Sequence, residues 1–396
     1  MTSKPKGGIT AGCGRHAPRA AETRRSINHI VWITVFFFVA VHPSLGISPA
    51  SRFQRWGEET LSRIQSEFWI PERNLYANKI TVGQPTPNRP AYMWGCGVQL
   101  SALTAAAHVD PKTYLPELES YLTGLRAYWT DYHNIPGFDV LPGPKPADRY
   151  YDDNEWMVLA LIEAYRDTND PAILTWAEQD FKFVMSGEDD KLGGGIYWHE
   201  QKRTSKNTCS NAPAIVGALS LYQITGKESY LNTARQLYDW VNAHLQDTDG
   251  LYFDHVNLSG VVDHTKWSYN SALMIRANCL FYEITHQQSY LQEAERIANA
   301  AQAMWIDPKS SAFIKDGAAF THLLSEAFLA LYRQDKNRRW LKVAWRGLVY
   351  LHKHCRDSNG NYPSSWSQSV TTPLKTASLL SMASNARAYW MAAEYH

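Results

Sequence analysis

Apolar residues recur along this chain at the spacing of helices rather than of strands. The segment 149–165, RYYDDNEWMVLALIEAY, places two acidic residues just before an apolar run with a helical pattern. No stretch keeps the strict apolar–polar alternation of a half-buried strand. The pattern therefore predicts an all-α protein.

A sequence repeat groups the predicted helices into pairs. Segments that begin at Tyr165, Tyr222 and Tyr282 each carry Thr three residues later, Leu nine later and Ala twelve later, and weaker copies begin at Ala106 and Tyr332. Successive copies start 59, 57, 60 and 50 residues apart. Each copy spans the end of one helix, a short polar turn and the start of the next helix. The repeat predicts six helical hairpins, which together make twelve helices.

The connections between hairpins are much longer than the turns within them. They cover roughly 70–93, 134–151, 187–210, 247–268, 307–319 and 356–375. Long irregular connections inside a compact domain usually carry function. Six hairpins with all long loops at one end predict an (α/α)6 toroid over residues 51–396, with its cleft on the long-loop face. The alternative is an open α-solenoid that serves as an interaction scaffold, although common solenoid repeats are shorter.

Residues 1–50 differ from the rest of the chain. Six basic residues and one acid, Glu22, precede a run of 12 residues from Ile30 to Val41 that is apolar except for Thr34, and small residues follow. This order is typical of a signal peptide, with cleavage predicted after Gly46 or Ala50. Such a run is short for a bilayer span, although an uncleaved anchor stays an alternative. We therefore expect an exported protein, either secreted or held at the cell envelope.

Charge and aromatic content narrow the class of partner. The chain has 39 basic and 38 acidic residues, which argues against nucleic acid or an anionic membrane surface as its main partner. It also has 15 Trp and 22 Tyr, whose flat amphipathic rings suit a sugar-binding cleft as well as a core. We expect a monomer that acts on a carbohydrate.

The cysteines show no metal-binding spacing. Cys13 belongs to the leader, and Cys96, Cys209, Cys279 and Cys355 are widely separated. Cys279 lies in an apolar helical run and is expected in the core. A domain of this size does not need disulfides, so we predict no essential one.

The pair Asp152–Asp153 has a structural and a chemical interpretation. Asp is a favoured helix N-cap, and Asp152 with Glu155 has the spacing of a capping box. This helix begins at the long-loop end, however, so the pair faces the predicted cleft. Neighbouring positions on a helix can hold two carboxyl groups about 5 Å apart, which is the separation found in retaining glycosidases.

Other polar and aromatic residues stand at the loop ends of neighbouring helices or within the long loops. We expect the following to bind a sugar substrate: Trp94, Tyr197, Trp198, Asn211, Asp263, Tyr269, Asn270 and Trp366. Each has a structural alternative, because caps and core side chains gather at the same places. His199, His264 and His322 are expected to be structural rather than catalytic.

At these motifs the sequence resembles glycoside hydrolase family 76, the endo-α-1,6-mannanases. YYDDNEW is similar to the catalytic motif of the family, and GGGIYW, Ser210-Asn211 and Tyr269-Asn270 follow in the family's order. The resemblance implies an (α/α)6 fold and retaining hydrolysis of α-mannan. It makes Asp152 the nucleophile and Asp153 the acid/base, with no metal or cofactor.

One departure and three alternatives stay open. Where the family tends to have Phe-Lys-Gly and then Arg, this chain has Phe320-Thr321-His322 and then Glu326, a possible charge reversal near the cleft. The alternatives are another sugar-acting (α/α)6 enzyme (an N-acylsugar 2-epimerase or an unsaturated glucuronyl hydrolase), a non-catalytic glycan-binding protein, and the open scaffold. A binder has no need of both aspartates, so the pair favours an enzyme.

Overall fold

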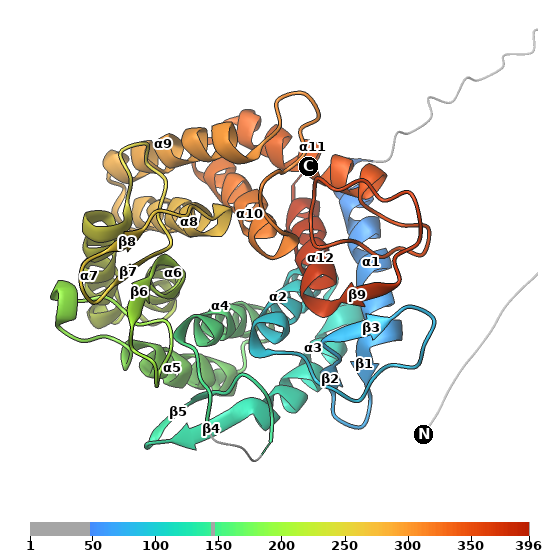
Figure 1. Cartoon of the computed structure of the whole chain (residues 1–396), viewed down its shortest axis with the longest axis horizontal. Helices are drawn as coiled ribbons and strands as arrows, with labels where there is room; N and C mark the ends of the chain where they lie inside the picture. The colour runs from blue at the N-terminus through green and yellow to red at the C-terminus, as the bar shows by residue number, and fades with distance from the viewer. Residues whose placement is uncertain (1–47, 144–146, 396) are drawn as a thin grey trace, which may run out of the picture. The chain divides into compact units, whose positions relative to one another are not determined.

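Two concentric rings of helices make up the part of the chain that the computed structural model describes, residues 48–143 and 147–395 (Figure 1). The inner ring consists of α2 (Met93–Val109), α4 (Tyr151–Thr168), α6 (Thr208–Thr225), α8 (Ser268–Thr285), α10 (Ala318–Asp335) and α12 (Leu379–Ala393). The outer ring consists of α1 (Pro49–Phe68), α3 (Pro111–Leu125), α5 (Pro171–Met185), α7 (Glu228–Leu245), α9 (Gln288–Trp305) and α11 (Arg338–His354).

The ring closes where the two ends of this helical array meet. Helix α12 packs against α1, α2 and α10, so the last helix completes the inner circle. The prediction of an (α/α)6 toroid built from helical hairpins is confirmed. The open solenoid was the wrong alternative, because a solenoid leaves its first and last repeats apart.

Burial explains which helices form each ring. In α6 every residue from Thr208 to Leu221 is buried, which fits a sequence with mostly apolar or small residues on every side of the helix. In the outer helix α7 only one stripe is buried, and its residues recur at helical spacing: Leu231, Ala234, Leu237, Trp240, Val241 and Leu245. The outer helices are amphipathic and shield the inner ones from water.

The repeated motif marks one kind of helix ending. Asn169, Gly226, His286 and Lys336 each stand four residues after the repeat tyrosine. All four have positive φ, between 54° and 67°, and their backbone N–H donates to the carbonyl of that tyrosine. This left-handed cap ends an inner helix and turns the chain directly into an outer one.

The long loops contain short strands that the hydrophobic pattern did not predict, because runs of two to four residues are too short to show alternation. The strands are β1 (Trp69–Ile70), β2 (Leu75–Tyr76), β3 (Lys79–Thr81), β4 (Trp129–Tyr132), β5 (Ile135–Phe138), β6 (Ser205–Asn207), β7 (His255–Asn257), β8 (Val262–Asp263) and β9 (Thr376–Ser378). They pair antiparallel as β1–β2, β3–β9, β4–β5 and β6–β7–β8. Pairs such as β3–β9 and β6–β7 join different loops and so stiffen the loop face.

The predicted leader falls mainly on residues 1–47, which lie outside the described residues. Helix α1 starts at Pro49, and the side chain of Ser48 caps it by accepting from the Ser51 N–H. Within residues 48–395 no helix combines the length and apolar character needed to cross a membrane. The four cysteines of this part are buried and carry free thiols.

Candidate active site

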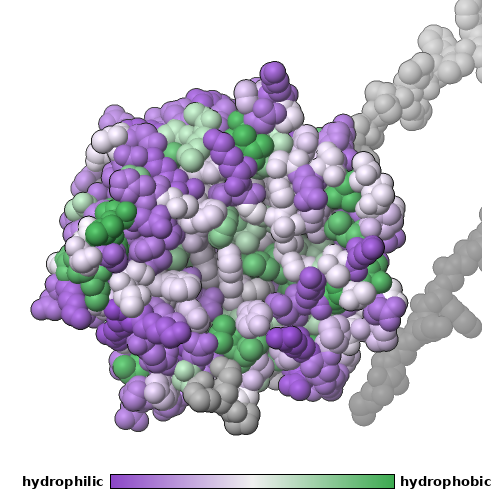
Figure 2. Space-filling model, in the orientation of Figure 1, coloured by the Kyte–Doolittle hydropathy of each residue, from purple (hydrophilic) through white to green (hydrophobic). Residues whose placement is uncertain are grey.

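A cavity of about 940 Å³ opens at the long-loop end of the ring. Figure 2 shows this face, and its middle is hollowed. Asp152 and Asp153 line the cavity together with residues from α2, α6, α8 and α10 and from the loops between them. The loop ends of the inner helices therefore converge on one site, with the acidic pair in its wall.

Asp152 and Asp153 occupy the first turn of α4, where backbone N–H groups are free of partners within the helix. The Oδ2 atom of Asp152 accepts a hydrogen bond from the indole Nε1 of Trp198 at 3.0 Å. The thiol of Cys209, on α6, donates to the same oxygen at 3.7 Å. Asp152 is thus held by donors from two other parts of the chain.

The two carboxyl groups differ in their electrostatic surroundings. Burial raises the pKa of Asp152 to about 6, while hydrogen bonds from Trp198, the Asp153 amide and Cys209 oppose that rise. Burial raises the pKa of Asp153 well above its usual range, and the negative charges of Asp152 and Asp148 raise it further. The charge of Asp152 therefore favours the protonated form of Asp153, whereas the hydrogen bonds to Asp152 favour its ionised form.

Aromatic rings form the wall of the cavity that α2, α8 and α10 contribute. Phe320 lies between Trp94 and Tyr269, with ring centroids 5.6 Å and 4.4 Å away and nearly parallel planes. All three line the cavity, and Trp156 continues the wall toward the aspartates. Such a surface presents flat apolar faces, which suit the C–H face of a sugar ring.

The loop that carries Trp198 is fastened to the start of α4. The Trp198 carbonyl accepts from the Tyr151 N–H at 3.0 Å, and the Arg149 carbonyl accepts from the Glu200 N–H at 3.1 Å. The buried guanidinium of Arg149 also donates to both carboxylate oxygens of Glu200. Asp152 and its indole donor thus belong to one braced unit.

Glycine supplies the base of this loop. Gly195 has a φ of +82°, and a Cβ there would lie 2.6 Å from the ring of Trp240. Both the left-handed backbone and the close approach require glycine at this position. The GGGIYW motif therefore places Trp198 by letting the loop pack tightly on α7.

Asn211 and Asn270, which were expected to contact substrate, do not line the cavity. Asn211 is fully buried, where its Oδ1 accepts from the Ile196 N–H at 2.8 Å and its Nδ2 donates to the Ile196 carbonyl at 3.0 Å. Asn154 on α4 makes the same pair of bonds with Phe138. Asn270, also buried, donates to the Phe253 carbonyl. These three asparagines fasten the loops that precede α4, α6 and α8 to those helices.

Tyr197 and Trp366, which were expected to bind substrate, do not line the cavity either. Both side chains are fully buried. The Tyr197 hydroxyl donates to Asp189 at 2.9 Å, and the Trp366 indole donates to Asn385 at 2.6 Å. Each ring fills space beneath a long loop, because a buried aromatic side chain needs both apolar contacts and one partner for its polar atom.

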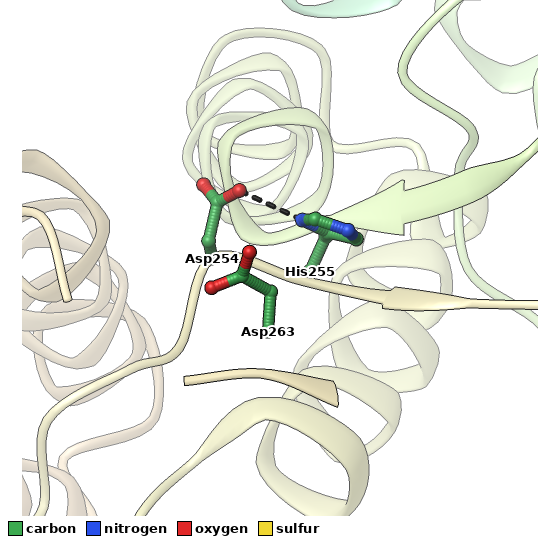
Figure 3. Close-up of side chains that lie close together, drawn as sticks. All are labelled: Asp254, His255 and Asp263. Carbon is green, nitrogen blue, oxygen red and sulfur yellow. Dashed lines mark hydrogen bonds and ion pairs between the residues drawn. The ribbon is translucent and has the colours of Figure 1, made fainter. Parts of the chain in front are cut away.

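Asp263 lies at the rim beside two residues that the sequence interpretation missed, Asp254 and His255 (Figure 3). The ligand atoms of the three side chains lie within 4.8 Å of one another, and Asp254 and His255 line the cavity. His255 Nδ1 and Asp254 Oδ2 are hydrogen-bonded at 2.8 Å, and Asp263 accepts from the Thr265 N–H. These bonds account for the cluster, so we assign no metal site to it.

The histidines singled out in the sequence have structural partners. His199 is buried and hydrogen-bonded to Asp148 at 2.9 Å, and His264 stacks on Phe253 with ring centroids 4.3 Å apart. Burial lowers the pKa of His322 to about 4, so this side chain is neutral. None of the three lines the cavity.

The sequence suggested that Glu326 reverses a charge near the cleft, but the structure places Glu326 elsewhere. It is buried in the barrel, 3.1 Å from Arg276 and 3.1 Å from Arg387. Within the segment 320–326, Phe320 therefore lines the cavity and Glu326 does not.

The sequence interpretation missed several residues that line the cavity. They are Asp148, Tyr150, Trp156, Cys209, Asp254, His255 and Phe320. Tyr150 and Trp156 flank the aspartates within the segment 149–165, so their closeness in sequence to the pair could have predicted that they line the cavity. His255 is the first residue of β7 and Asp254 directly precedes it, and only the folded loop brings them to the cavity.

Comparisons with known proteins agree with this architecture. The model of glycosyl hydrolase family 76 matches residues 67–391. An α-mannanase structure of that family from Bacteroides thetaiotaomicron, BT2949, is 30% identical, covers 88% of this chain and 98% of its own, and has a TM-score of 0.82. The α-1,6-mannanase GH76A of Salegentibacter sp. HEL1_6 shares the fold at 22% identity and a TM-score of 0.74, covering 86% of this chain and 99% of its own.

Among curated sequences, the yeast mannan endo-1,6-alpha-mannosidase DCW1 of Saccharomyces cerevisiae is 26% identical over 168 residues. The aligned region is 38% of this chain and 37% of the yeast protein. The chain thus spans little more than a third of the length of that relative.

Proposed function

Because the chain belongs to glycosyl hydrolase family 76, we propose that it is a retaining glycoside hydrolase that cleaves α-1,6-linked mannan. Asp152 is the nucleophile and Asp153 the acid/base. The observation that carries this proposal is that the two carboxyl groups in the cavity wall differ in pKa. Hydrogen bonds oppose the effect of burial on the pKa of Asp152, whereas burial and the charge of Asp152 raise the pKa of Asp153.

The roles follow from the surroundings of each group. A nucleophile must be ionised, and Asp152 has the lower pKa of the two, about 6, with Trp198 and Cys209 donating to its carboxylate. An acid must hold a proton at working pH, and Asp153 has the higher pKa. A role reversal would put the proton on the group that the indole and thiol stabilise in its charged form.

In the first step Asp152 attacks the anomeric carbon, the glycosidic C–O bond breaks, and Asp153 gives its proton to the departing oxygen. In the second step Asp153, now a carboxylate, takes a proton from water. That water forms a bond to the anomeric carbon, and Asp152 leaves as a carboxylate. The proton count of the pair is restored after each cycle.

The substrate class follows from the cavity wall and the relatives. Stacked Trp94, Phe320 and Tyr269 offer apolar faces to sugar rings, while Asp254 and His255 offer polar groups for hydroxyls. The Bacteroides relative is an α-mannanase and the yeast relative a mannan endo-1,6-alpha-mannosidase. A cavity of about 940 Å³ has room for more than one sugar unit.

Digestion of linear α-1,6-mannan, with the products separated by chromatography, tests the activity. We expect short α-1,6-manno-oligosaccharides. Release of no product, with the polymer still bound, would overturn hydrolysis and favour a glycan-binding protein. Conversion of a reducing-end mannose to glucose without a fall in polymer length would favour an epimerase.

We also propose that the protein is exported. The support is the order of basic, apolar and small residues in positions 1–50. Trimming after Gly46 preserves the Ser48 cap of α1, whereas trimming after Ala50 removes it. N-terminal sequencing of the protein from its native host distinguishes these sites, and an intact Met1 would contradict cleavage.

A further inference from the structure

Helix α11 carries a one-sided array of basic residues. Its 17 residues include five with permanent positive charge and no acid. These five are Arg338, Arg339, Lys342, Arg346 and Lys353, and all are exposed. At 100° per residue they fall within an arc of about 100° of the helix circumference. We call these five residues the α11 face.

The α11 face has no charge compensation within the described residues. None of its five side chains forms an ion pair there, whereas Arg55 of the neighbouring helix α1 pairs with Glu59. Arg339 donates only to the amide oxygen of Gln302. Positive potential therefore concentrates on this side of the outer ring, although the whole chain has a net charge of only +1.

A groove of about 340 Å³ between α1 and α11 adjoins this face. Its lining combines the cations Arg52, Arg346 and Lys353 with the rings of Trp345 and Tyr350, and it contains no acidic side chain. Both rings are half-buried, so each offers only part of its surface to the groove beside the cations, and Trp and Tyr are the side chains that favour the level of lipid headgroups.

The chain enters the ring at the same groove. Pro49, the first residue of α1, belongs to its lining. The apolar run of the leader ends at Val41, so seven residues separate it from Pro49 in the sequence. Fully extended, this link reaches about 28 Å at most. Whenever the apolar run is in a bilayer, Pro49 and its groove are therefore held near that bilayer.

We propose that the α11 face and its groove dock on the surface of an anionic phospholipid bilayer. The even charge balance of the whole chain does not oppose this, because screening limits each interaction to about 8–10 Å, and only the local charge counts. Helix α11 lies in the outer ring, so docking leaves the cavity at the end of the ring open to substrate (Figure 1).

Vesicle co-sedimentation of the full chain tests the proposal. The probes are vesicles of pure phosphatidylcholine and vesicles that also contain phosphatidylglycerol, at about 0.1 M salt. The test variant is Lys342→Gln, Arg346→Gln and Lys353→Gln combined. The matched control removes the same number of exposed charges from α3, α5 and α7: Lys112→Gln, Lys182→Gln and Arg235→Gln. Using the full chain keeps any contribution of the leader equal in all proteins.

We expect the parent chain and the control to prefer anionic vesicles, and the α11 variant to lose this preference by on the order of 100-fold in partition coefficient. Raising the salt should weaken the preference in the parent chain. Equal binding of the parent chain to both vesicles, or equal loss in the control, would overturn the proposal. The proposal would also be overturned if the parent chain bound an acidic polysaccharide column through the α11 face and showed no preference between the two kinds of vesicle. Neither variant touches the cavity, so hydrolysis of soluble mannan should be unchanged.

Discussion

Two clusters of buried acids lie along the inner ring, and their electrostatics are opposite. At the cavity, burial raises the pKa of Asp152 to about 6. Deeper in the barrel, Arg276 and Arg387 overcome the effect of burial and lower the pKa of Glu326 to about 2. Asp152 and Glu163 even share helix α4, eleven residues or about 16 Å apart, and Glu163 is paired with Arg387.

The difference lies in the cations. Within the described residues no lysine or arginine forms an ion pair with Asp152 or Asp153, whereas Arg387 forms hydrogen bonds with both Glu163 and Glu326. An arginine beside an acid keeps it ionised over the whole working range, which suits a structural brace. A site without one allows a carboxyl group to hold and release a proton.

Replacing the acids of the cavity gives the largest expected change in activity. Asp152→Asn and Asp153→Asn should each lower kcat on α-1,6-mannan by at least about 10³-fold, because each removes a group that reacts. Their thermal stability should hold or rise, because Asp152→Asn removes a costly buried charge and Asp153→Asn replaces a carboxyl group that is already protonated. Asp239→Asn, on the exposed side of α7, is the control. Near-parental turnover of either variant would contradict its role.

Breaking the deeper cluster should have the reverse effect. Glu326→Gln leaves Arg276 without its carboxylate in the barrel interior, so we expect a loss of about 3–5 kcal/mol in the free energy of unfolding. Activity per folded molecule should stay close to that of the parent. Urea unfolding measures the free energy of unfolding, with the exposed variant Glu119→Gln as the control. The kcat per folded molecule measures the activity. A stable variant with impaired kcat would show that the two clusters are coupled.

Removing the indole donor should shift the pH profile. The Trp198 hydrogen bond lowers the pKa of Asp152, so Trp198→Phe should raise that pKa. Activity needs ionised Asp152 and rises as pH increases through its pKa, so the acidic limb should move to higher pH. The expected loss at pH 5 is about 10-fold, near the value of one charge-assisted hydrogen bond. A uniform loss at every pH would indicate a stacking role alone.

The smallest expected effect concerns Glu155, which is buried in α4 two residues after Asp153. Burial and nearby Asp152 raise its pKa well above the usual range, so folded Glu155 keeps a proton that the unfolded chain releases. Stability from this group is present at low pH and falls as pH rises past the unfolded pKa. Glu155→Gln should therefore gain melting temperature relative to the parent as pH increases from 5 to 8. A constant difference between the two proteins would contradict this assignment.

The sequence predicted the hairpins, the ring and the acidic helix start because these depend on local periodicity and on a repeat. It did not separate Trp198 from Tyr197, adjacent residues of which one lines the cavity and the other is buried. The backbone of a loop decides which of two neighbouring side chains faces the site. Asn211 likewise looked like a ligand because a buried bond to a loop backbone leaves no trace in sequence spacing.

The stereochemistry of the reaction tests the central claim most directly. Proton NMR of α-1,6-mannan hydrolysis, recorded before mutarotation, identifies the anomer released first. We expect adjacent aspartates in one helical turn to hold their carboxyl groups closer together than the roughly 6.5–9.5 Å that the water of an inverting enzyme requires. Double displacement through Asp152 predicts the α-anomer first. Initial release of the β-anomer would contradict a nucleophilic Asp152 and require a base elsewhere in the cavity.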